Sequence, residues 1–255
     1  MDEEESIANK DYRHQAVATI AEDWTSPNTG VTRKKGEPVI SMGITQYDKK
    51  HMLTFPLPNV TAMCLDQSYT AWSESQYFLQ EAEFLDFSEG HAPEGTIRPK
   101  EDFTFFDLLQ KRMIAIVFAF TALESFANEN IPDDFIFRKQ RDDKKCIEEY
   151  TKEQTEHLSL DLKLHEVLPL IFSVSSPKGD NIWNKYIFIK KLRDRIIHMK
   201  SKDRTYSQIG EENIWKELLN QSYPNVAMEA KTIIGYYLSR IPEKDRPRWY
   251  KKFPW

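Results

Sequence analysis

Cysteine is scarce in this chain. Its 255 residues include only Cys64 and Cys146. Two cysteines cannot form the disulfide framework of a small secreted domain, nor a four-cysteine zinc site. The six histidines show no HExxH spacing, and the two cysteines show no CxxC spacing. Both frameworks are therefore excluded, and we expect a reduced, intracellular protein.

Long hydrophobic runs are also missing. The longest, Met113 to Phe120, has eight residues, whereas a membrane-spanning helix needs about 20. The N-terminus is acidic and has no apolar core behind it, so no secretory signal is expected. No Gly-rich phosphate loop is present either, which disfavours a nucleotide-binding fold. We expect a soluble cytoplasmic protein with no membrane partner.

Glycine is rare, at 8 residues, and 11 of the 21 glycines and prolines lie before position 100. The hydrophobic fraction of 40% is sufficient for a sizeable core. The later part should therefore be rich in helices. We expect a mainly α protein: a bundle of about five helices over residues 71–240, a small β-containing appendage over 1–70, and a basic aromatic tail over 241–255.

The residue pattern suggests bounds for these elements. A short helix is expected around Asp11 to Trp24, and a loop over 88–102. Short β-favouring stretches are expected at 38–45, 51–55 and 59–65. Helical patterns cover 71–85, 103–130, 142–174, 182–200 and, with a break near Pro224, 211–240.

The net charge of −5 argues, taken alone, against a nucleic-acid binder. Its distribution argues the opposite. Residues 185–204 contain eight basic and two acidic residues, a local charge of +6, which leaves −11 for the rest. An acidic body with one basic helix would direct a phosphate backbone to that helix. The candidate RNA-binding residues are Lys190, Lys191, Arg195 and Lys200.

The end of this helix also carries candidate catalytic residues. His198 has a side chain whose unperturbed pKa is about 6.5, suited to acid–base chemistry near neutral pH. Asp194 stands four residues earlier, where it could orient the imidazole. Arg193 and His198 are five residues apart, about 140° around a regular helix. Two copies facing each other across a two-fold axis could combine these groups in one cleft.

The run Arg193-Asp194-Arg195-Ile196-Ile197-His198 resembles the signature of HEPN-domain ribonucleases: Arg, then Asp, Asn or His, then three residues and His, near the end of a late bundle helix. A second similarity is the aromatic and acidic pattern from Ala122 to Glu129 on the preceding long helix. The resemblance covers roughly residues 71–240.

This resemblance implies a dimeric helical bundle that cleaves RNA without metal or cofactor, by attack of the ribose 2′-hydroxyl on the adjacent phosphate. His198 would be the acid or base, Arg193 the phosphate ligand and Asp194 the orienting group, with Glu124 and Asn128 in support. Such enzymes commonly act as toxins or in antiviral defence, which implies an antitoxin or defence partner. Toxins modified by a nucleotidyltransferase usually have Tyr two residues after the histidine; here that residue is Lys200.

Two other functions remain open. Pro132-Asp133 followed by Asp143-Lys144-Lys145 is similar to the pattern of metal-dependent nucleases, although the segment is expected to be a loop and a helix rather than paired strands. The third possibility is a non-catalytic bundle that binds RNA or a protein. Its tail would supply cations interleaved with aromatic residues for stacking on bases; these are Arg240, Lys244, Arg246, Arg248, Lys251 and Lys252, with Trp249, Tyr250, Phe253 and Trp255.

Overall fold

The computed structural model describes residues 11–90, 93–140, 147–204 and 213–253. The chain is mainly α-helical, with small separate pairs of strands. It divides into two compact units: unit 1 comprises Met1–Met63 and Ile241–Trp255, and unit 2 comprises Cys64–Arg240. Within the described residues, no helix is long and apolar enough to cross a bilayer.

The described residues of unit 1 contain three antiparallel strand pairs. β1 (Ala16–Thr19) pairs with β4 (Pro38–Ile40), β2 (Trp24–Thr25) with β3 (Thr32–Arg33), and β5 (Met42–Gln46) with β6 (Met52–Pro56). The helix predicted around Asp11 to Trp24 is therefore wrong, because this backbone finds its hydrogen-bond partners across the ladder to β4 and not along its own chain.

The basic tail belongs to unit 1. It forms the short helices η3 (Glu243–Asp245) and α10 (Arg248–Lys252). Trp249 and Phe253 are buried, and the Phe253 ring meets Tyr12 edge to face at 6.2 Å between centroids. These two aromatic rings are thus used in packing, which removes them from the set available for stacking on bases.

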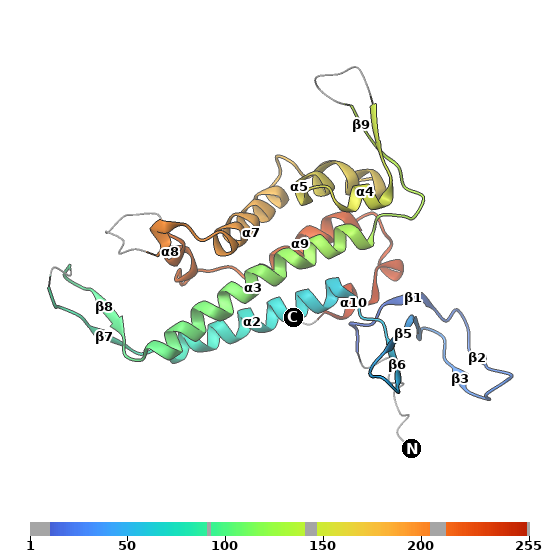
Figure 1. Cartoon of the computed structure of the whole chain (residues 1–255), viewed down its shortest axis with the longest axis horizontal. Helices are drawn as coiled ribbons and strands as arrows, with labels where there is room; N and C mark the ends of the chain where they lie inside the picture. The colour runs from blue at the N-terminus through green and yellow to red at the C-terminus, as the bar shows by residue number, and fades with distance from the viewer. Residues whose placement is uncertain (1–10, 91–92, 141–146, 205–212, 254–255) are drawn as a thin grey trace. The chain divides into compact units, whose positions relative to one another are not determined.

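Unit 2 is built on two long helices, α2 (Val60–Glu81) and α3 (Asp102–Glu129). They lie side by side (Figure 1), and Ser68 Oγ donates to the Ala115 carbonyl oxygen at 2.7 Å. α3 confirms the predicted central helix. The strand predicted at 59–65 is wrong, because the Asn59 side chain accepts a hydrogen bond from the Ala62 N–H and so caps the start of α2.

Two hairpins interrupt the helical region. β7 (Phe84–Asp86) pairs with β8 (Ile97–Pro99), and β9 (Phe137–Gln140) pairs with β10 (Ile147–Tyr150). β8 lies where a loop was predicted, whereas the helix predicted over 71–85 is wrong at its last residues, because α2 ends at Glu81 and the chain then pairs as β7. The helix predicted from residue 142 is wrong over β10; its first residues, 142–146, lie outside the described part of the chain.

The rest of that predicted helix is a series of short pieces. Ser159 caps a new start by accepting a hydrogen bond from the Leu162 N–H, and Pro169 lies in the first turn of the last piece. The pieces are α4 (Lys152–Glu156), α5 (Leu160–Leu162), the π-helix η1 (Lys163–Val167) and α6 (Leu168–Phe172).

Two further helices pack against α3. α7 (Asn181–Ile197) and α9 (Val226–Leu238) pack against α3 and against each other. One face of α9 is buried in the core, and Tyr237 on it donates its hydroxyl hydrogen to the Leu164 carbonyl oxygen at 2.6 Å. Along the chain, η2 (Ser201–Asp203) and α8 (Ile214–Leu218) come between α7 and α9. The start of the helix predicted over 211–240 lies outside the described residues at 211 and 212.

Candidate functional site

The C-terminal half of α7 positions Arg193. Its guanidinium Nη1 lies 2.9 Å from Asp194 Oδ1, and its Cζ lies 4.4 Å from the centroid of the Phe120 ring on α3. The Arg193 side chain keeps 29% of its surface exposed. An arginine held by one carboxylate oxygen and one ring face retains N–H groups for an incoming anion.

His198 is the residue at which α7 ends. The helix stops at Ile197, and His198 has non-helical dihedral angles while its backbone N–H still donates to the Asp194 carbonyl oxygen at 2.9 Å. The residue is exposed. Within the described part of the chain, its imidazole has neither a hydrogen bond nor an ion pair. The Asp194 carboxylate, expected to orient this ring, instead pairs with Arg193.

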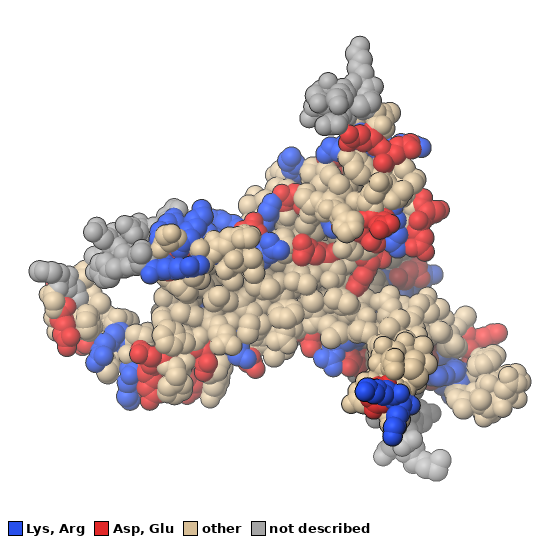
Figure 2. All heavy atoms as spheres, viewed as in Figure 1, with Lys and Arg blue, Asp and Glu red and all other residues tan. Residues whose placement is uncertain are grey.

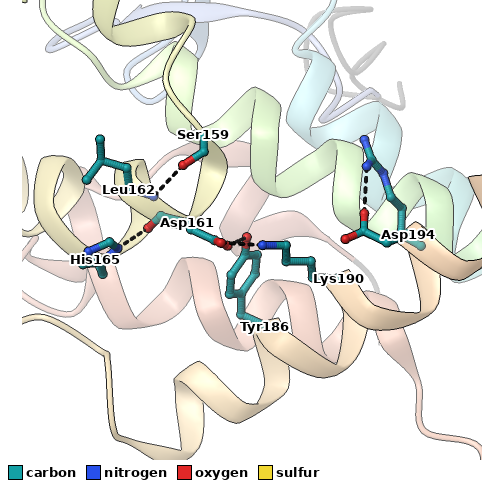
Figure 3. A network of polar contacts seen from close by, with 8 residues as sticks. Ser159, Asp161, Leu162, His165, Tyr186, Lys190 and Asp194 are labelled. Carbon is teal, nitrogen blue, oxygen red and sulfur yellow. Dashed lines mark hydrogen bonds and ion pairs between the residues drawn. The ribbon is translucent and has the colours of Figure 1, made fainter. Parts of the chain in front are cut away.

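A polar network lies one to two turns earlier on α7. Asp161 of α5 lies between the Tyr186 hydroxyl and the Lys190 ammonium and accepts a hydrogen bond from each (Figure 3). Burial alone would raise the pKa of Asp161, but these two hydrogen bonds, together with the nearby charges of Lys190 and His165, hold the pKa below the usual value. Lys190, predicted to bind RNA, is therefore neutralised by Asp161.

Arg195 has a structural partner as well. It pairs with Asp203, which is fully buried and also accepts hydrogen bonds from the backbone N–H groups of Lys200 and Ile214. Burial opposes the charge of this carboxylate, but the Arg195 hydrogen bond and these backbone donors lower the pKa of Asp203. The ion pair joins α7 to η2, and the Ile214 N–H bond to the same carboxylate joins η2 to the start of α8.

The supporting residues on α3 face the π-helix η1. The Asn128 side-chain oxygen accepts a hydrogen bond from buried Lys163 Nζ at 2.7 Å, and the Glu156 carbonyl oxygen accepts another at 2.9 Å. Burial lowers the pKa of Lys163, while the nearby charges of Glu124 and Glu156 oppose that shift. Glu124 and Asn128 thus compensate a buried lysine.

A fully buried arginine also anchors α8. Arg112 of α3 is fully buried, and its Nη1 donates to the backbone carbonyl oxygens of Leu218 and Asn220, the latter at 3.0 Å. Its guanidinium also lies over the Tyr223 ring at 5.0 Å. A cation at the carbonyl end of a helix satisfies its unpaired acceptors. Two arginines therefore hold the chain that follows the candidate site. Arg195 binds it at Asp203, and Arg112 binds it at the end of α8.

Cations without an acidic partner gather beyond this framework. Figure 2 shows Lys and Arg side chains clustered over α7 and α8. Within residues 185–204, four of the cationic side chains are exposed and have no acidic partner among the described residues, and they form what we call the free basic set: Lys191, Lys200, Lys202 and Arg204. Of the residues predicted to contact RNA, Lys191 and Lys200 belong to this set, and Lys190 and Arg195 are paired.

An apolar groove lies on the side of α7 that carries Ile196. It has a cavity volume of about 630 Å³, and Gln110 is its only polar lining side chain among the described residues. One wall is the N-terminal half of α3, including Phe106 and Met113, and the other is formed by Ile196 with Trp215 and Leu219. Ile196 lies between Arg193 and His198 in the sequence, so the groove adjoins the candidate site.

The metal-nuclease pattern is only partly within the described residues. Asp133 forms an exposed ion pair with Lys152 at 2.6 Å, whereas Asp143, Lys144 and Lys145 lie outside the described residues. No group of three or more His, Cys, Asp or Glu side chains in the described ranges is arranged to hold a metal ion.

Comparison with known proteins does not assign this chain to a family. No protein-family model, no curated protein and no solved structure matches this chain.

The sequence patterns found Arg193, Asp194 and His198, but not the groups that hold them. Phe120, Tyr186 and Asp161 were missed as parts of the site. Tyr186 lies three residues before Ile189 and seven before Arg193. Its place on the same face of α7 could therefore be predicted from the spacing. Phe120 and Asp161 lie on other helices, and nothing in their own segments indicates the contact.

Proposed function

We propose that the protein is a metal-independent endoribonuclease of the HEPN type, acting as a toxin or a defence effector. The observation that carries this proposal is the end of α7, where a half-buried arginine, an exposed histidine and the free basic set occur together. Single-stranded RNA needs cations along its backbone, and a cleaving enzyme needs a proton-transfer group beside a phosphate ligand.

In the proposed reaction, the ribose 2′-hydroxyl attacks the adjacent phosphorus and the 5′-oxygen leaves. The products are a 2′,3′-cyclic phosphate and a 5′-hydroxyl. His198 removes the proton from the attacking hydroxyl or supplies one to the leaving oxygen, a contribution of roughly 10²–10⁴-fold. Arg193 donates hydrogen bonds to the phosphate oxygens as charge develops. Asp194 holds Arg193 and not the imidazole.

The proposal includes a homodimer whose composite site takes Arg193 from one copy and His198 from the other. The apolar groove next to Ile196 supports this arrangement, because an unpartnered apolar surface beside the candidate site favours a second chain there. The test is to mix Arg193→Ala and His198→Ala protomers. A composite site regains cleavage on mixing, because one of its two sites is intact. Failure to regain it, with a cleaving monomer in light scattering, rejects the dimer.

Activity is tested with total cellular RNA, with and without EDTA. Wild type should cut in EDTA and His198→Ala should not. A matched control is His157→Ala, since His157 is also exposed and also ends a helix, α4. Cleavage abolished by EDTA but intact in His198→Ala rejects the proposal in favour of a metal-dependent nuclease.

A non-catalytic RNA-binding module is the second candidate, because the free basic set binds phosphates whether or not cleavage occurs. Salt-sensitive RNA binding without any cleavage is the result that favours it.

A further inference from the structure

The Arg193 side chain rests on an aromatic platform. Its Cζ is 4.4 Å from the centroid of the Phe120 ring, well inside the 6 Å range over which a cation is attracted to a ring face. Phe120 is 4% exposed, so the ring is part of the core and cannot move away freely. The guanidinium is thus bounded by an immobile surface on one face and by Asp194 at one nitrogen.

The platform is itself fixed by the helix that carries Arg193. Phe120 stacks on Tyr186 of α7, with centroids 6.4 Å apart and planes 22° apart. Tyr186 is 1% exposed and donates its hydroxyl hydrogen to Asp161. Tyr186 and Arg193 are seven residues apart, two turns along one face of α7. Phe120 therefore touches this face at two points, and Arg193 cannot turn about its long side chain without leaving the ring.

An aromatic ring suits this task better than a second carboxylate. A carboxylate offers oxygens that compete with a phosphate for the same N–H groups, whereas a ring orients the guanidinium and leaves its charge and its donors available. Ordering the arginine before the ligand arrives removes a conformational-entropy cost from binding and from the transition state.

We infer that Phe120 is the positioning residue for Arg193, holding its guanidinium ready for a phosphodiester anion. The identity of the anion rests on the proposed function, but the platform itself does not.

The test compares Phe120→Leu with Phe126→Leu. Both residues are buried phenylalanines on α3, and Phe126 stacks on Phe172 rather than on an arginine. The two variants should lose similar thermal stability. Phe120→Leu should lower the single-turnover cleavage rate about 10-fold or more, at little change in KM, whereas Phe126→Leu should stay close to wild type. Phe120→Tyr, which retains the ring face, should restore the rate. Equal rates for the two leucine variants overturn the inference.

A second measurement separates this inference from the proposed function. In the RNA-free protein, the Arg193 side-chain NMR signals, assigned with Arg193→Lys, should show an upfield ring-current shift. That shift should persist in Phe126→Leu and disappear in Phe120→Leu, or in Phe120→Met if the leucine variant does not fold. Unshifted signals in wild type reject the platform. A shift that behaves as expected, in a protein that cuts no RNA, leaves the platform standing and rejects the ribonuclease.

Discussion

The two ends of α7 use their positive charges differently. Within its first ten residues, Lys185 pairs with Glu229 and Lys190 with Asp161, and all four side chains are about one-quarter to one-third exposed. From residue 191 onward and just beyond the helix, four cations are exposed and have no acidic partner in the described ranges: Lys191, Lys200, Lys202 and Arg204. The first group holds the helix onto its neighbours, and the second is available to a ligand.

Arg193 and Arg195, two residues apart, also differ in whether their charge is paired inside the protein or available to a ligand. Arg195 is 16% exposed at its side chain and pairs with a carboxylate that is fully buried. Arg193 is 29% exposed, its carboxylate partner is 43% exposed, and its other contact is a neutral ring. A local charge of +6 therefore overstates the positive field that RNA would meet, because part of it is neutralised inside the protein.

The largest effect should come from breaking the buried pair. Asp203→Asn keeps the shape of the side chain but leaves Arg195 without its anion. Loss of one partner of a buried ion pair costs about 3 kcal/mol here, the low end of the usual range because Arg195 keeps some contact with water. Urea denaturation measures it. Asp23→Asn, which removes a carboxylate from an exposed pair with Lys34, is the control and should have a far smaller effect. Equal losses would refute the contrast between buried and exposed pairs.

Arg193→Gln should leave stability nearly unchanged and lower the cleavage rate by about 10²–10³-fold, because a transition-state donor is lost. Lys185→Gln is the matched control on the same helix and should cleave at the wild-type rate. Single-turnover kinetics on one RNA measures both. A loss of activity in Lys185→Gln as large as in Arg193→Gln would show that both ends of α7 act in the same way.

The long helices were predictable from sequence because their apolar stripes extend over many turns. α3 and most of α7 lie where the periodicity placed them. The hairpins β7–β8 and β9–β10 were not predictable. β7–β8 is a two-stranded ribbon whose side chains are mostly exposed, so no alternation of buried and exposed residues marks it. β9–β10 does alternate in burial, with Phe137 buried, but each strand has only four residues, and neither Phe-Arg-Lys-Gln nor Ile-Glu-Glu-Tyr alternates apolar and polar residues in sequence. Asn59 was overlooked as a cap, and the start of α2 was misread as a strand.

The candidate site was predictable only along α7. The spacing of Arg193, Asp194 and His198 is a local property of one segment. Asp161 and Phe120 contact α7 only through tertiary packing. Asp161 lies 29 residues before its partner Lys190. Phe120 lies in the centre of the apolar helix α3 and contacts Arg193. A charge count treats Lys190 and Lys191 alike. Only the fold shows that the first has a partner and the second has none among the described residues.

Removing two members of the free basic set should weaken RNA binding in proportion to the charges lost. For the double variant Lys191→Gln and Lys202→Gln, the slope of log affinity against log salt should fall by about 1 to 1.5. A double variant on the other side of the candidate site, Lys178→Gln in the segment before α7 with Lys185→Gln in its first turns, should keep the wild-type slope. Fluorescence titration with a single-stranded RNA at several salt concentrations measures this. An equal change in both variants would mean that binding does not distinguish the two ends.

The smallest effect should come from Tyr186→Phe, which keeps the ring against Phe120 but removes the hydroxyl that donates to Asp161. We expect a loss of about 1.5–2 kcal/mol at pH 7, the low end for a hydrogen bond to a charged group, with the cleavage rate unchanged. The Asp161 pKa is lowered in the folded protein, so this stabilisation is full above the unfolded value of about 3.9 and is lost as the pH falls through the folded value. The gap between wild type and variant should therefore narrow below about pH 4 in denaturation curves. A constant gap down to pH 2 would mean that the hydroxyl stabilises the fold without the Asp161 charge.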